Sequence, residues 1–186
     1  MPSKSTNKIL DGMFTFLIIA LAFSGVVYGC RGKSLPYVPL RTFDEQRYMG
    51  HWYELARFDH RFERGLEYVT ADYELLGDGK FKVTNTGFDA KTGRRRIITG
   101  KGKATSVKGH LRVSFFLAFY FDYNILYLSD DYDRVIIGSR TSKYLWIMAR
   151  TPKLTTEKLN ELVNIARDKG YDVDKLIFTV QERTFR

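Results

Sequence analysis

The side chains that most often carry chemistry are few in this chain and stand far apart. His51, His60 and His110 lie near different turns and lack the spacing of a metal site. The aspartates between 130 and 133 are typical of a solvated turn. The sequence contains no Gly-rich phosphate loop, and its order supports no Ser-His-Asp arrangement. We therefore expect a binding protein rather than an enzyme, with no metal and no cofactor.

The single cysteine, Cys30, excludes a disulfide within the chain and is best understood from its position. Lys4 and Lys8 precede an apolar run over residues 12–29 that carries no charge, and Cys30 follows directly. A basic start, a short apolar stretch and a small residue before the break are typical of a secretory signal peptide. The stretch is slightly short for a transmembrane helix, which needs about 20 apolar residues.

The segment VVYGC, which ends at Cys30, resembles a lipobox, where a signal peptidase cuts before a cysteine that carries diacylglycerol. Gly29 fits this motif, although Tyr28 is bulkier than the residue usually found there. A plain signal peptide or an uncleaved anchor are the alternatives. Attached acyl chains would hold the protein on a bilayer. In bacterial lipoproteins Asp after the cysteine implies retention in the inner membrane, so Arg31 points to the outer membrane, at its periplasmic face.

These segments divide the chain into three parts. We expect a lipoprotein-type signal peptide at 1–29, a lipidated tether at 30–46 and one folded domain at 47–186. The formal net charge of +9 invites a nucleic-acid partner. However, the cations are scattered among alternating apolar residues, and Arg94–Arg96 follow a turn signal. We therefore predict no nucleic-acid binding, and a basic surface that favours anionic lipid headgroups.

From Trp52 onward, apolar and polar residues alternate with period two, which indicates β-strands. Short turn signals separate eight such segments, and successive short strands favour an all-β fold, an eight-stranded antiparallel up-and-down barrel. An apolar stripe after a Thr155 N-cap predicts one C-terminal α-helix packed outside the barrel, ended by Gly170 and followed by a short final strand. The expected strands span 52–59, 67–76, 79–89, 94–105, 109–116, 123–130, 133–140 and 143–150.

One parity of each strand should face the barrel interior, which in an eight-stranded barrel is either filled or holds one small ligand. Small residues, aromatics and a few polar groups on that face favour a ligand cavity, and a solid core is the alternative. The expected ligand-binding residues are Ala56, Ala71, Tyr73, Val83, Asn85, Val113, Phe115, Tyr123, Ile125, Tyr127, Trp146 and Met148.

Three segments carry a family likeness. They are GHWYE at 50–54, SDDYDRVII at 129–137, and the arginine that ends YLWIMAR, Arg150. In this order and spacing, with a helix after the third, the chain resembles the lipocalins, most closely the bacterial outer-membrane lipoprotein lipocalins and apolipoprotein D. The resemblance implies that Gly50, Trp52 and Arg150 form the closed base of the barrel, with the Arg150 guanidinium stacked over the indole.

The resemblance also implies a function, namely binding, storing or transporting a fatty acid or lysophospholipid in cell-envelope lipid maintenance. A headgroup would lie near the open end, where Arg57, Arg61 and Arg64 could meet phosphate. The alternatives are an envelope interaction lipoprotein with a filled barrel, and a lipid- or isoprenoid-modifying enzyme. The aromatic segment 115–123 is expected to form a gate, a lipid-contacting lip or a homodimer surface.

Overall fold

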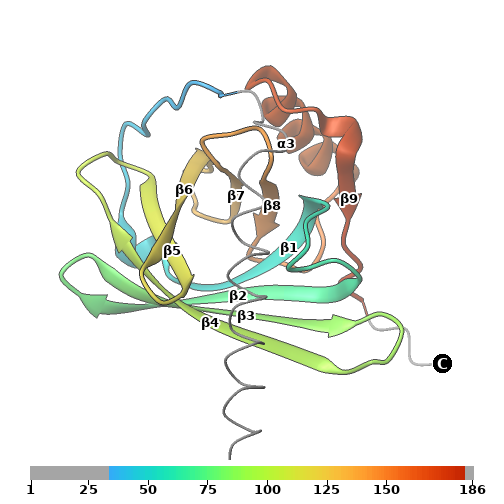
Figure 1. Cartoon of the computed structure of the whole chain (residues 1–186). Coiled ribbons are helices and arrows are strands. Elements are labelled where there is room, and N and C mark those ends of the chain that lie inside the picture. Colours follow the sequence, from blue (N-terminus) through green and yellow to red (C-terminus); the bar gives the residue numbers. More distant parts are fainter. Residues whose placement is uncertain (1–33, 183–186) are drawn as a thin grey trace, which may run out of the picture. The chain divides into compact units, whose positions relative to one another are not determined.

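The computed structural model describes residues 34–182, so Cys30 and the predicted signal peptide lie outside the described residues. The described strands form a single antiparallel sheet in the order β2-β3-β4-β5-β6-β7-β8-β1-β9, and a further β1–β2 pairing closes it into a barrel (Figure 1). The strands are β1 (Gly50–Phe58), β2 (Leu66–Gly77), β3 (Lys80–Asp89), β4 (Arg95–Ala104), β5 (His110–Phe116), β6 (Phe119–Leu128), β7 (Arg134–Gly138), β8 (Leu145–Ala149) and β9 (Leu176–Phe178).

This arrangement confirms the predicted fold: eight strands close the barrel, and β9 is the short final strand. Helix α3 (Thr156–Asp168) is the predicted C-terminal helix, and its N-cap Thr155 accepts a hydrogen bond from the Lys158 amide. A short helix, α2 (Glu45–Tyr48), precedes β1, and a 3₁₀ turn, Val173–Lys175, precedes β9. None of the helices among residues 34–182 is long and apolar enough to span a bilayer.

The buried apolar residues form two separate clusters, one on each side of the barrel wall. The interior cluster contains Trp52 from β1, Tyr73 from β2 and Ile125 from β6. The outer cluster joins Leu162 and Ala166 of α3 to Leu145 and Ile147 of β8. The helix is therefore held by its apolar stripe against the outside of the wall.

The two ends of the barrel differ. At the closed end, α2 precedes β1, and the β2–β3, β4–β5 and β6–β7 turns are short. At the opposite end, the open end, lie the β1–β2, β3–β4, β5–β6 and β7–β8 connections, which include residues 59–65 and 139–144. The chain passes Ser34 beside Thr141 at the open end, then runs past Lys108 to α2 at the closed end.

Strands β1 and β2 pair directly only near the closed end, from Gly50–Tyr73 to Tyr53–Thr70. Farther along, β1 pairs with β9 instead, as Ala56 opposite Phe178 shows. The Gln181 side chain completes this part of the wall, because its amide nitrogen donates to the carbonyls of Glu54 at 2.6 Å and Val69 at 2.8 Å. The segment after α3 is thus an integral part of the barrel wall.

Candidate ligand-binding site

The closed end is built on Trp52 and Arg150. The Trp52 indole is fully buried, and the Arg150 guanidinium carbon lies 3.8 Å from its ring centroid. Arg150 also donates to the backbone carbonyls of His51 at 2.8 Å and Met49 at 2.7 Å. Gly50, between them, has φ of +93°, which a residue with a side chain rarely adopts. The geometry is the one that the resemblance implies for these three residues.

Above this base, three tyrosine hydroxyls meet inside the barrel. The Tyr123 hydroxyl of β6 lies 2.6 Å from that of Tyr48 and 2.8 Å from that of Tyr73. Burial raises the pKa of all three tyrosines, so each hydroxyl keeps its proton at neutral pH. Because Tyr48, Tyr73 and Tyr123 come from α2, β2 and β6, this cluster joins opposite walls of the barrel.

Aromatic rings fill the space beside two glycines of β4. A β-carbon at Gly102 would lie 2.1 Å from the Phe81 ring, and one at Gly100 would lie 2.7 Å from the Phe115 ring. These two glycines are among the small interior residues that, on sequence grounds, favour a ligand cavity. Instead they let the rings of Phe81 and Phe115 cross the interior, so the part of the barrel near the closed end is packed.

Toward the open end, the interior face is accessible to solvent. Asn85 follows the interior Val83 by two residues in β3 and is paired with Ile98 of β4. The Ile98 side chain is 48% exposed. Phe121 is paired with the interior Val113 and is 54% exposed. Paired residues in antiparallel strands point to the same side of the sheet. The interior face therefore offers apolar side chains that nothing in the described part of the chain covers.

A polar atom accompanies this open apolar region. The Oδ1 atom of Asn85 is buried and makes no hydrogen bond to the described residues. A buried acceptor without a partner costs free energy, on the order of 1–3 kcal/mol. Asn85 thus presents an unused hydrogen-bonding group on the interior face.

A buried pair of an arginine and a carboxyl group lies in β1, beyond the closed end. Arg57 Nη1 donates to Glu54 Oε1 at 2.6 Å, and both side chains are almost completely buried. Burial and the carboxylate of Glu63 raise the pKa of Glu54 to about 8, against the opposing effects of Arg57 and Thr179. Arg57 also donates through Nη2 to the Glu63 carbonyl at 2.8 Å, so it fixes the β1–β2 connection.

The neighbouring carboxylate of Glu63 points toward Trp146 and His60. Its Oε2 atom accepts from Trp146 Nε1 at 3.1 Å and lies 2.9 Å from His60 Nε2. Burial works against the charge of Glu63, but the hydrogen bond and charge of His60 hold its pKa below the ordinary value. His60 Nδ1 is buried and has no partner among the described residues. Tyr144 stacks on Trp146, with the rings 5° from parallel.

Most of the predicted ligand-binding residues belong to the interior cluster or pack against it. Tyr123 and Phe115 are partly buried there, as is Trp146, and Asn85 shares the interior parity of Val83. The cluster itself includes Ala71, Tyr73, Val83, Val113, Ile125 and Met148.

Two predicted ligand-binding residues, Ala56 and Tyr127, lie on the other side of the wall. Both pack in the outer cluster with residues of α3. The cause is a β-bulge in each strand, between Glu54 and Ala56 in β1 and between Ile125 and Tyr127 in β6. One extra residue inverts the side to which all following residues point.

Sequence patterns also missed the roles of Arg57 and Glu54. Arg57 had been expected to meet a phosphate at the open end, but it is 2% exposed and paired with Glu54. Five successive buried residues at 54–58 leave no alternation from which a bulge could be placed, so the three-residue spacing of Glu54 and Arg57 was the only available signal.

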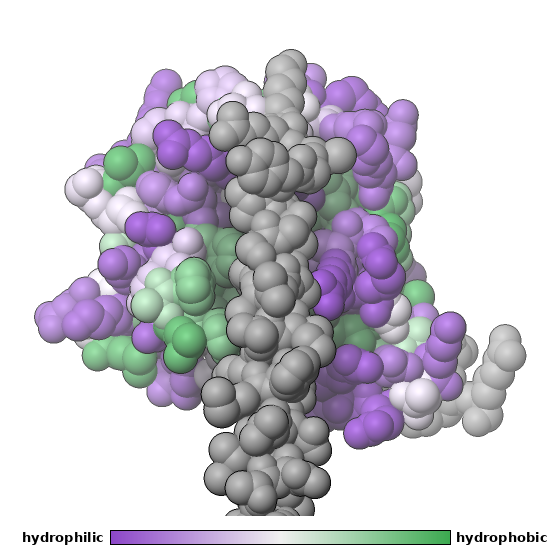
Figure 2. Space-filling view, viewed as in Figure 1, coloured by the Kyte–Doolittle hydropathy of each residue, from purple (hydrophilic) through white to green (hydrophobic). Residues whose placement is uncertain are grey.

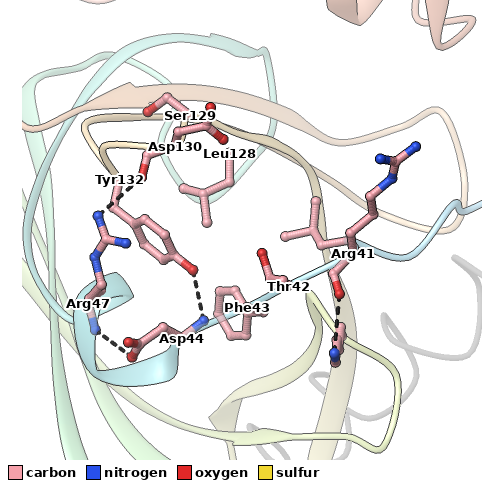
Figure 3. Close-up of a pocket in the computed structure, with 11 residues that line it drawn as sticks. Arg41, Thr42, Phe43, Asp44, Arg47, Leu128, Ser129, Asp130 and Tyr132 are labelled. Atoms are coloured by element: carbon pink, nitrogen blue, oxygen red, sulfur yellow. Dashed lines mark hydrogen bonds between the residues drawn. The ribbon is translucent and has the colours of Figure 1, made fainter.

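A separate pocket of about 480 Å³ lies at the closed end, between the segment preceding β1 and the β6–β7 turn (Figure 3). Tyr132 accepts a hydrogen bond from the Asp44 amide at 2.8 Å and lies 4.1 Å beneath the Arg47 guanidinium. Arg47 also donates to the Asp130 carbonyl. These contacts hold α2 against the barrel. The polar groups that line the pocket are therefore already used in contacts within the protein. Among the described residues, no group of three His, Cys, Asp or Glu could hold a metal ion.

The comparisons with known proteins agree with this geometry. The family model of the lipocalin-like domain matches residues 43–181. The chain is a lipocalin. It is 39% identical over 169 residues to the outer membrane lipoprotein Blc of Escherichia coli K12, with 89% of this chain and 96% of the relative covered. This lipocalin is also 28% identical to mouse apolipoprotein D, with 91% and 96% covered.

Solved structures show the same fold at lower sequence identity. Insecticyanin from the tobacco hornworm Manduca sexta superposes with a TM-score of 0.66 at 18% identity, covering 81% of this lipocalin and 87% of that chain. Apocrustacyanin C1 superposes with a TM-score of 0.67, also at 18% identity, covering 82% and 91%. At this identity the likeness concerns the fold alone.

Proposed function

We propose that this lipocalin is a membrane-anchored carrier of a fatty acid or lysophospholipid. The observation that carries the proposal is the half-exposed interior face at the open end, where Ile98 and Phe121 present apolar surface and Ile98 is paired with Asn85, whose Oδ1 atom has no partner among the described residues. An acyl chain placed against these side chains would be stabilised by about 25 cal/mol per Å² of apolar surface removed from water. Asn85 would supply one oriented polar contact.

The anchor in this proposal is a lipid on Cys30. Two relatives carry the name outer membrane lipoprotein, one from Escherichia coli at 39% identity and one from Vibrio cholerae at 35%. The match to this lipocalin covers 96% and 98% of their length. We extend that location to this lipocalin, with the barrel at the periplasmic face of the outer membrane.

Two neighbouring isoleucines of β4 allow a matched test of the ligand site. Ile98 is on the interior face and 48% exposed, while Ile97 is on the outer face and 53% exposed. Ile98→Glu would place a carboxylate in the acyl path, whereas Ile97→Glu adds the same charge one residue away on the other side of the wall. We expect displacement of a fluorescent fatty acid to weaken at least about tenfold in the first variant, equivalent to about 1.4 kcal/mol.

The control Ile97→Glu should bind the fatty acid and a lysophospholipid as the unaltered protein does. Equal affinities of the two variants would contradict an interior site. Native mass spectrometry of delipidated protein adds an independent measurement, and the absence of micromolar binding to either lipid class would reject the carrier function.

One observation favours a second candidate, an envelope interaction protein with a filled barrel. Phe81 and Phe115 occupy the space beside Gly102 and Gly100, and the tyrosine cluster fills the interior above Trp52. The same titration separates the two candidates, because a filled barrel binds neither lipid.

A further inference from the structure

The described chain begins at the open end of the barrel. Ser34 forms a β-bridge with Thr141 in the β7–β8 connection, and the Leu35 amide donates to the Arg140 carbonyl at 3.3 Å. Ser34 is four positions after Cys30, and a chain of four residue steps spans at most about 14 Å. A lipid on Cys30 therefore holds the open end, rather than the closed end, near the bilayer surface.

Exposed apolar side chains gather at that same end. Phe62 in the β1–β2 connection is 71% exposed, and Leu117 at the tip of the β5–β6 hairpin is 70% exposed. Phe116 and Phe119 on either side of Leu117 are also exposed, and their rings stack 6.4 Å apart. Figure 2 shows an apolar patch in the area where Figure 1 places β5 and β6. Contiguous exposed apolar surface of this kind marks an interaction site.

The backbone at the hairpin tip is held in an uncommon conformation. Leu117 has φ of +49°, in the left-handed region that disfavours residues with a side chain. Glycine or asparagine would adopt this turn with less strain. A large apolar residue at such a position, turned to solvent, is explained if its side chain has a partner outside the barrel.

The charges of the two ends are opposite. The connections between strands at the open end carry five exposed cations that have no ion pair within residues 34–182: Arg61, Lys91, Arg94, Arg140 and Lys143. The exposed carboxylates nearby, on Asp59 and Asp89, are paired with Arg64 and Arg96. At the closed end the turns between strands carry four aspartates: Asp78, Asp130, Asp131 and Asp133.

We propose that the open end docks on a bilayer surface that contains anionic phospholipid. The β5–β6 tip and Phe62 enter the interface, and the five unpaired cations contact lipid phosphates. This inference rests on the lipid anchor of the proposed function. Apolar tips enter the boundary between headgroups and acyl chains by about 5–10 Å, and each nearby cation strengthens binding about fivefold. The interior then opens directly toward the lipid from which a ligand would come.

Depth-dependent fluorescence quenching tests this orientation on the lipidated mature protein, reconstituted into vesicles of phosphatidylethanolamine and phosphatidylglycerol. Leu117→Trp places a reporter at the hairpin tip, and Asp131→Trp places the same reporter at the closed end. Trp52 and Trp146 of the unaltered protein provide the background. We expect shallowly brominated lipids to quench the Leu117→Trp signal and to leave the Asp131→Trp signal at background.

Equal quenching of the two reporters, or none at Leu117→Trp, would overturn the docking proposal. A tip buried against a second copy of the chain would also overturn it, and would appear as a blue-shifted Leu117→Trp emission that depends on protein concentration and not on brominated lipid. Adding Lys91→Glu and Arg94→Glu should abolish quenching of the Leu117→Trp reporter in anionic vesicles. Adding Asp130→Lys should not make the closed-end Asp131→Trp reporter quenchable.

Two measurements keep this result separate from the proposed function. Mass spectrometry of the reconstituted protein reports whether Cys30 carries lipid. Displacement of a fluorescent fatty acid reports whether the barrel binds a ligand. A lipidated, ligand-binding protein whose tip is not quenched would overturn the docking while leaving the carrier function in place.

Discussion

The Arg150 guanidinium lies over the buried Trp52 ring and donates to backbone carbonyls of the segment that contains α2. One side chain at the end of β8 thereby joins β1, α2 and the β6–β7 turn, where it also donates to the Tyr132 carbonyl. These contacts of Arg150 hold the closed end together. Lysine could not reproduce it, since an ammonium lacks the planar fork that stacks and donates simultaneously.

Arg150→Lys should therefore destabilise the fold by about 2–3 kcal/mol, through weaker stacking and lost charged hydrogen bonds. Chemical denaturation followed by far-ultraviolet circular dichroism measures this change. Arg140→Lys, in an exposed connection at the open end, is the control and should stay within about 0.5 kcal/mol of the unaltered protein. Similar stabilities of the two variants would contradict the role given to Arg150.

Tyr123→Phe should cost about 1–3 kcal/mol, because it leaves the buried hydroxyls of Tyr48 and Tyr73 without their shared partner. The ring, and with it the apolar packing, is retained. Tyr53→Phe serves as the control, since no hydroxyl hydrogen bond of Tyr53 is found in the described part of the chain. Equilibrium unfolding in urea compares the two, and a neutral Tyr123→Phe would show that the cluster adds no stability.

The stability of the protein should fall as the pH rises from about 4.5 to about 8. The folded-state pKa of Glu54, raised to about 8 by burial and by Glu63, exceeds its ordinary value of 4.5, so folding takes up a proton in this range. Above about 8 this contribution becomes constant. Glu63, whose pKa is lowered, acts in the opposite sense and loses its stabilising effect as the pH falls below about 4.5.

Glu54→Gln removes the titrating group and should flatten the decline in melting temperature between these pH values. Glu74→Gln, in an exposed pair with Lys82, should retain the decline. An unchanged slope in the Glu54→Gln variant would assign the pH dependence to other groups.

Mass spectrometry of the mature protein should find a chain that begins at Cys30 and carries acyl groups. Cys30→Ala should abolish the acylation and remove the protein from the outer-membrane fraction, while ligand binding by the barrel persists. An unmodified Cys30 thiol in protein recovered from membranes would contradict the anchor.

The sequence predicted the barrel, its order of strands and the outer helix because period-two alternation and short turns dictate an antiparallel barrel. It did not predict which side Ala56 and Tyr127 face, since β-bulges leave no signature in a segment that is buried on both sides. Nor did it predict the Glu54–Arg57 pair. Both residues are buried by the segment that includes β9 and by the β1–β2 connection, and the alternation within β1 carries no information about these distant segments.

The Gln181 amide bridges Glu54 and Val69, residues 127 and 112 positions earlier in the chain. The wall between β1 and β2 is thus completed by a segment synthesised long after both strands. A nascent chain cannot complete this part of the wall before Gln181 has left the ribosome, and such long-range pairing is slow to form. The order of synthesis therefore leaves this part of the wall incomplete until residue 181 has emerged.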